Sequence, residues 1–262
     1  MAPDPKSLWP REHGAYVQLG VALACGVALG HGSRGISVAL LTVGLFLASE
    51  PVLVLLGRRG AVPRGAAQIR AALRLLILGS FILLAAFGAL AGAPAVHFLS
   101  LLPPAILGTV LFLLFVLRLE RTAAGELLAA WTFSAAAGCV TLLGGGGVHR
   151  ANSLVWLLGG MFTVAAFVVH GHILALKKGG KAWPRALAAV LALAVTAIAW
   201  AFIRHAALRR WGIGALVPID LAALWTLLTP PAPDRLRSLG WLATVCAILG
   251  GLVAVAALWQ VH

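Results

Sequence analysis

The sequence predicts an all-α fold, a polytopic transmembrane bundle of about nine helices that forms a single domain over residues 1–262. Of these residues, 61% are hydrophobic and 10% are charged, whereas soluble domains average about 45–50% apolar and 25% charged residues. Apolar segments close to the roughly 20 residues that a bilayer requires fill most of the chain. The segments are continuous and lack the alternating pattern of β-barrel strands, so we expect helices and no separate soluble domain.

The first four apolar segments lie at about 13–30, 36–57, 72–92 and 97–117. Pro10 suits the first turn of the first helix, where its missing N–H is not needed. Ala22, Gly26 and Gly30 recur every four residues on that helix, which predicts close contact with a second helix. In the fourth segment, the pair Pro103-Pro104 predicts a kink.

The other five segments lie at about 124–144, 153–173, 184–204, 211–229 and 238–259. Gly144 to Gly147 form the turn between the fifth and sixth segments. Asp220, near the middle of the eighth, is an expensive charge inside a membrane, and a proton-relay role or a buried pairing with an arginine would explain it. Trp183, Trp211 and Trp241 lie near segment ends, as interfacial aromatic residues do.

The basic residues predict the orientation of the bundle. With nine spans, 15 of the 20 Lys and Arg residues fall on the side of the N-terminus, and the opposite loops carry no acidic residue. Because cytoplasmic loops are enriched in Lys and Arg, we expect a cytoplasmic N-terminus and an outside C-terminus.

The net charge of +13 would favour nucleic-acid binding in a soluble protein. Here the basic residues lie in short loops beside apolar segments, where they set orientation and contact anionic lipids. We therefore expect the lipid bilayer as a partner and no nucleic acid. Cys25, Cys139 and Cys246 all lie in apolar runs without metal-ligand spacing, which is typical of buried free thiols.

Candidate binding residues gather on the predicted cytoplasmic side. Arg11, Glu12 and His13 stand where the first helix enters the membrane, and Glu50 lies about 10 Å inside the end of the second helix. A carboxylate at that depth requires an arginine, a histidine, a metal ion or water. The other members of this candidate polar cluster are Arg121, Glu126, His170 and His172. A structural ion pair of Glu50 with Arg11 or Arg121 is the alternative interpretation.

Metal or haem binding is a weaker hypothesis for the histidines. His170 and His172 are two residues apart and therefore lie on opposite sides of a helix, unless Gly171 ends it. With His13 and a carboxylate they suggest a divalent-ion site, or bis-His haem ligation between the first and sixth helices. Histidines at a membrane interface without a metal are commoner, so no metal ligand is assigned.

The segment Pro10-Arg11-Glu12-His13-Gly14-Ala15-Tyr16 resembles the signature of the YwiC-like family of bacterial multi-pass membrane proteins of unassigned activity. The resemblance continues through Pro51 and through Arg121-Thr122 with Glu126-Leu127-Leu128. It implies a multi-pass protein of the bacterial inner (cell) membrane.

The nine-helix plan is also similar to that of the UbiA superfamily of intramembrane prenyltransferases. That family binds magnesium and a prenyl diphosphate through aspartate-rich loops after its second and sixth helices. The corresponding loops here lack the aspartates, so the resemblance implies a UbiA-like fold without the two-magnesium chemistry. An anionic headgroup would instead contact Arg58, Arg59, Lys177 and Lys178.

The leading functional hypothesis is therefore a membrane protein with a cytoplasm-facing polar pocket that binds or modifies an isoprenoid or another amphipathic lipid. The alternatives are a small-solute or proton-coupled transporter, and a haem-binding membrane protein. The sequence assigns no catalytic residue and no cofactor, and it leaves open whether the protein is an enzyme.

Overall fold

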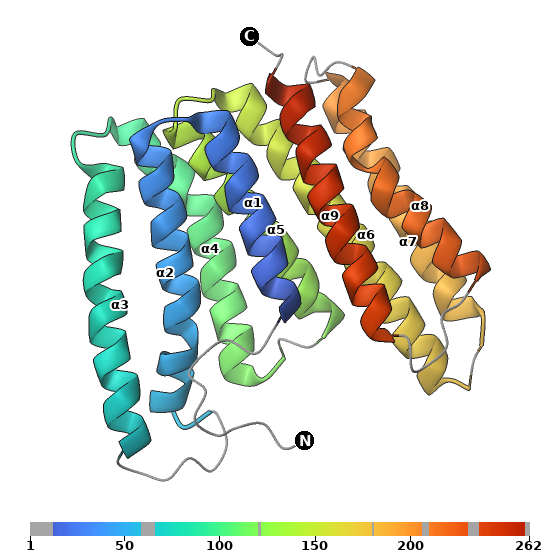
Figure 1. Ribbon diagram of the computed structural model, residues 1–262, viewed down its shortest axis with the longest axis horizontal. Coiled ribbons are helices and arrows are strands. Elements are labelled where there is room, and N and C mark those ends of the chain that lie inside the picture. Colours follow the sequence, from blue (N-terminus) through green and yellow to red (C-terminus); the bar gives the residue numbers. More distant parts are fainter. Residues whose placement is uncertain are drawn as a thin grey trace.

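A computed structural model describes residues 13–58, 66–119, 122–179, 181–205, 210–229 and 236–259 (Figure 1). These residues form helices and no strands, which confirms the all-α prediction. The elements are α1 (His13–Gly30), α2 (Ser33–Leu55), α3 (Ala66–Leu90), α4 (Ala95–Leu117), α5 (Ala123–Leu143), α6 (Val148–Lys177), α7 (Trp183–His205), the 3₁₀ helix η1 (Arg210–Ala215), α8 (Val217–Leu228) and α9 (Leu236–Trp259). In the described part of the chain, seven helices are long and apolar enough to cross a membrane, and α1 and α8 are the shorter apolar ones.

The eighth predicted segment differs from expectation, because it is η1 followed by α8 rather than one helix over 211–229. Gly212 and Gly214 weaken an α-helix, and the ring of Pro218 at the start of α8 clashes with a helical turn before it. Six 3₁₀ residues and twelve α-helical residues together extend about 30 Å, close to the thickness of a bilayer core.

The sixth helix is longer than the predicted 153–173. It runs without interruption for 30 residues from Val148 to Lys177, which corresponds to a length of about 45 Å. Gly171 does not end the helix. It lies against α7, where a Cβ atom at position 171 would stand 2.6 Å from the Cβ of Ala188.

Burial identifies α5 and α6 as the centre of the bundle. In the most apolar 18-residue stretch of each helix, 67% of α5 and 72% of α6 is buried inside the bundle, whereas only 11% of α3 and 6% of α4 is buried. Helix α1 packs against α5 and α9, α3 packs against α2, and α7 packs against α6. The end of the bundle at which α1 begins, the lower end in Figure 1, is called the N-terminal end below, and the opposite end is called the far end.

Backbone contact between α1 and α5 confirms the small-residue stripe. A Cβ atom on Gly26 would stand 2.7 Å from the carbonyl oxygen of Ala137. A Cβ atom on Gly144, directly after α5, would stand 2.8 Å from the Cα of Gly30. Ala22 is completely buried in the same stripe. The two helices can approach this closely only because the contact positions carry small side chains or none.

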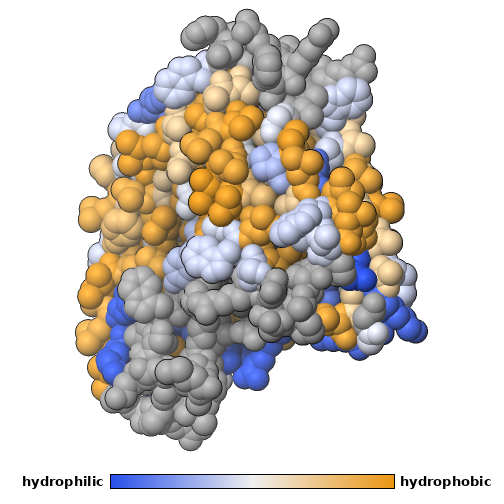
Figure 2. Space-filling view, turned by 45° about the vertical axis from the view of Figure 1, so that its right-hand side comes forward, coloured by the Kyte–Doolittle hydropathy of each residue, from blue (hydrophilic) through white to orange (hydrophobic). Residues whose placement is uncertain are grey.

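The outer surface is apolar over most of its height. Figure 2 shows a broad hydrophobic band, with hydrophilic side chains concentrated along its lower edge. Large apolar side chains on α3, such as Ile77 at 71% and Leu84 at 73%, are almost fully exposed. Exposed apolar faces of this extent require a lipid environment, so the protein is an integral membrane protein.

The α1–α5 contact predicts the effect of adding one methyl group. Gly26→Ala should destabilise the protein by about 1–3 kcal/mol, because its Cβ would press on the backbone of α5. Gly20→Ala is the matched control on the same helix, since nothing lies within 4 Å of a Cβ there. Thermal unfolding of both variants in detergent would measure the difference, and equal melting temperatures would contradict the close contact.

Candidate functional site

Glu50 lies in the last two turns of α2 and is 1% exposed. The next residue is Pro51, which has no N–H to donate to the carbonyl of the preceding turn and therefore weakens the helix at that point. Because Glu50 is almost completely buried near the end of α2, its carboxylate lies within the packed part of the bundle, close to its N-terminal end. Burial of a charge at such a place is unfavourable unless other groups compensate it.

Tyr16 on α1 and Arg74 on α3 share the surroundings of Glu50. The hydroxyl of Tyr16 interacts electrostatically with both Arg74 and Glu50. It is buried and has no hydrogen-bond partner among the described residues. Three separate helices thus bring Tyr16, Glu50 and Arg74 to one place, which is called the Glu50 site below.

An aromatic layer covers the Glu50 site on the side of the bundle interior. The ring of Tyr16 packs edge to face against Phe46, one turn before Glu50, with 5.1 Å between ring centroids. Phe46 in turn packs against Phe133 of α5, with a centroid distance of 6.0 Å. The site therefore combines polar groups at its outer end with aromatic rings further in.

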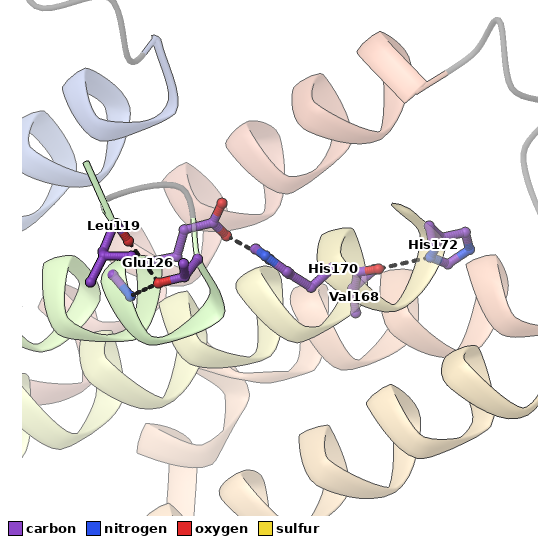
Figure 3. A network of polar contacts seen from close by, with 7 residues as sticks. Leu119, Glu126, Val168, His170 and His172 are labelled. Carbon is purple, nitrogen blue, oxygen red and sulfur yellow. Dashed lines mark hydrogen bonds and ion pairs between the residues drawn. The ribbon is translucent and has the colours of Figure 1, made fainter. Parts of the chain in front are cut away.

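Glu126 and His170 connect α5 and α6 at the same end of the bundle, where Figure 3 shows them pointing toward each other. The Nδ1 of His170 lies 3.0 Å from the Oε2 of Glu126, and the side chains are 28% and 39% exposed. Thr122 holds the start of α5, since its hydroxyl accepts from the N–H of Gly125 and donates to the carbonyl of Leu119. A carboxylate in the first turn of a helix also interacts favourably with the helix dipole.

His172 points to the opposite side of α6, toward α8 (Figure 3). It is 5% exposed, and its ring nitrogens lie 2.8 Å from the carbonyl oxygen of Val168 and 3.1 Å from that of Thr226. The structure thus places His170 and His172 in two different surroundings, as expected for two residues in an unbroken helix.

The remaining candidates are dispersed or undescribed. Arg58 is exposed, and its carbonyl accepts from the guanidinium of Arg118 at 3.1 Å. Lys177 is exposed, and the ammonium of Lys178 lies 4.7 Å from the ring centroid of Trp183. Four candidates and one side chain lie outside the described residues: Arg11, Glu12, Arg59, Arg121 and the side chain of His13.

Asp220 belongs to the first turn of α8 and not to the middle of one continuous helix. Its carboxylate accepts a hydrogen bond of 3.0 Å from the hydroxyl of Thr196 on α7. The helix dipole also favours an acidic side chain at this position. Within the described ranges, no group of three or more His, Cys, Asp or Glu side chains could hold a metal ion.

The sequence interpretation missed Tyr16 and Arg74 as members of the site. Tyr16 ends the Pro10–Tyr16 motif and is the only tyrosine of the chain. Arg74 was counted only among the 15 basic residues on the side of the N-terminus, and it lies inside α3. A charge within a membrane helix usually has a partner, and this was the signal that could have identified Arg74.

Comparison with known proteins now identifies the family. The model of the family described as YwiC-like protein matches residues 9–141, slightly more than half of the chain. The chain belongs to the YwiC-like family. The matched region includes α1 to α4 and nearly all of α5, and thus the whole Glu50 site together with Glu126. Neither the curated proteins nor the solved structures gave a match.

The Glu126–His170 contact predicts a small energetic coupling. Both side chains are partly exposed, and pairs of this kind contribute only about 0.2–1 kcal/mol because solvent screens them. A double-mutant cycle of Glu126→Gln and His170→Gln, measured by unfolding, should give a coupling energy in that range. A coupling above about 2 kcal/mol would show that the pair lies in a much drier environment than its exposure indicates.

Proposed function

We propose that this YwiC-like protein binds an amphipathic lipid at the Glu50 site, with an isoprenoid as the leading class of ligand. The observation that carries the proposal is the fully buried carboxylate of Glu50, which shares its surroundings with Tyr16 and Arg74. A bundle that needed only packing would gain stability from an apolar residue at this position, since burial of a carboxylate is unfavourable. Ionisable residues inside membrane helices commonly mark functional sites.

The chemistry of the site suits a polar headgroup. Glu50 can accept hydrogen bonds from a hydroxyl or ammonium group, while the guanidinium of Arg74 and the hydroxyl of Tyr16 can donate to a phosphate or carbonyl oxygen. The Tyr16 hydroxyl is a donor that no described residue uses. A headgroup at this place would complete its hydrogen bonding.

The surroundings of the site suit an apolar tail. Phe46 and Phe133 present aromatic surface directly inward of the polar groups. Helix α3 packs on α2 and α4 packs on α5, whereas α2 and α4 have few contacts with each other. A tail would reach the bilayer along this boundary between α2 and α4.

Mass spectrometry of the purified full-length protein tests this function. The wild-type protein should retain a defined lipid in near-stoichiometric amount, and Glu50→Gln and Tyr16→Phe should reduce it by about tenfold, the effect of losing one charge-assisted contact. Asp220→Asn is the matched control. Asp220 is also a carboxylate within the bundle, but it lies on α8 and accepts a hydrogen bond from Thr196 on α7, and neither helix contributes to the Glu50 site.

Two outcomes would count against lipid binding. The first is recovery of bulk membrane lipids alone in the wild-type protein. The second is a specific lipid whose amount is the same in the wild-type protein, in Glu50→Gln and in Asp220→Asn, which would place the lipid elsewhere.

We further propose that the N-terminal end of the bundle faces the cytoplasm of a bacterial cell, with the protein in the inner membrane. The excess of Lys and Arg residues on this side supports the proposal. The Glu50 site would then open toward the cytoplasmic leaflet.

Cysteine labelling of intact cells tests the orientation without background, since the three native cysteines are buried. Val148 at the far end and Ala182 at the N-terminal end are both exposed and outside the Glu50 site. A membrane-impermeant maleimide should label Val148→Cys and should label Ala182→Cys only after the cells are opened. The reverse pattern would show the opposite orientation.

A further inference from the structure

Helices α2 and α4 end in the same kind of hydrogen-bonded turn. The backbone nitrogen of Arg58 lies 2.9 Å from the carbonyl oxygen of Leu53, and that of Leu119 lies 2.9 Å from the carbonyl oxygen of Leu114. In both turns the acceptor stands five residues before the donor, which is the pattern of a Schellman motif. Such a turn requires a residue in the left-handed conformation directly before the donor.

The left-handed residue differs between the two helices. In α2 it is Gly57, with a φ of 65°, and glycine is the usual residue there because it has no Cβ. In α4 it is Arg118, with a φ of 61° and a ψ of 30°. This conformation is unfavourable for a residue that carries a Cβ. The backbone of α4 therefore does not explain the arginine, and its side chain must be considered.

The side chain of Arg118 reaches the end of α2. Its guanidinium donates a hydrogen bond of 3.1 Å to the carbonyl oxygen of Arg58, and both residues are exposed. Two arginines that are 60 residues apart in the chain thus meet at the N-terminal end of the bundle. No carboxylate among the described residues pairs with either of them. A guanidinium has five N–H donors, so most of those on Arg118 remain available to a ligand.

The sequence around this pair is strongly basic. Residues 56–66 and 117–123 contain five arginines and one acidic residue, Glu120. Glu120 and the other three arginines, Arg59, Arg64 and Arg121, lie outside the described residues. Because like charges repel each other, an anion bound beside Arg118 would stabilise this end of α2 and α4.

Exposed leucines border the two arginines. Leu56 at the end of α2 is 53% exposed, and Leu117 and Leu119, on either side of Arg118, are 61% and 44% exposed. A surface that joins positive charge to apolar side chains at the edge of a membrane matches an anionic lipid better than a free anion in water. The phosphate would contact the guanidinium groups, and the acyl chains would contact the leucines.

We propose that Arg58 and Arg118 bind the phosphate group of an acidic phospholipid from the surrounding membrane. A planar guanidinium suits this ligand, because it can donate two parallel hydrogen bonds to a phosphate. The acyl chains lie against Leu56 and Leu117 on the outside of the bundle. The site is separate from the Glu50 site, since Glu50 is 1% exposed and stands eight residues before Arg58 in the chain.

Titration with defined lipids tests this site. Delipidated full-length protein in detergent is mixed with phosphatidylglycerol or phosphatidylcholine, and native mass spectrometry counts the bound lipids. The wild-type protein should bind the first phosphatidylglycerol more tightly than phosphatidylcholine. Arg118→Gln and Arg58→Gln should each weaken the binding of phosphatidylglycerol by about fivefold, the effect of losing one arginine near a membrane surface.

Arg34→Gln is the matched control for the titration. Arg34 also donates to a carbonyl at the end of a neighbouring helix, that of Gly92 at 2.9 Å, but it lies at the far end of the bundle. This variant should keep the wild-type affinity for phosphatidylglycerol. Equal affinities in the wild-type protein, Arg118→Gln and Arg34→Gln would overturn the proposal, as would equal affinities of the wild-type protein for the two lipids.

Arg118→Gly separates the role of the side chain from that of the backbone. Glycine suits the left-handed conformation, so this variant should fold as the wild-type protein does. Phosphatidylglycerol should raise the melting temperature of the wild-type protein more than that of Arg118→Gly, because bound lipid stabilises the folded state. If Arg118 served only to link α2 and α4, phosphatidylglycerol would raise both melting temperatures equally, and this result would contradict the site.

Discussion

Direct backbone contact between α1 and α5 is the constraint on which the other helix positions depend. Gly26 and Gly30 contribute no side chain to this contact, so α1 lies against the most buried part of the bundle. This contact sets the height and rotation of α1, and therefore places Tyr16 against Phe46 and beside Glu50. The polar site at the N-terminal end thus depends on small residues located several turns away from it.

The positions of the helices could be predicted from the sequence, because the thickness of the bilayer sets the length of an apolar segment. The division of the eighth segment into η1 and α8 could not be predicted, since hydropathy does not reflect how Gly212, Gly214 and Pro218 alter the backbone. The extra turns of α6 were missed for a related reason. They contain charged residues at both ends and therefore fall outside a purely apolar window.

The candidate site could be predicted only in part. Glu50, Glu126 and His170 were identified because a titratable group beside an apolar run is unusual, whereas Tyr16 and Arg74 join Glu50 through the packing of α1, α2 and α3. The direction of His172 depends on a carbonyl of α8 that no local pattern reveals. Single titratable residues in the sequence thus indicated candidate members of the site, and the packing of the helices determines which of them lie together.

The length of α6 has a consequence for how the protein sits in its membrane. A helix of about 45 Å cannot stand upright with both ends inside a hydrocarbon core of roughly 30 Å. It must lean, or extend into the headgroup regions, where His149 and Arg150 at one end and Lys177 and Lys178 at the other can reach water. Because α5, α7 and α8 all pack against α6, a change in bilayer thickness that alters its tilt is transmitted to the whole bundle.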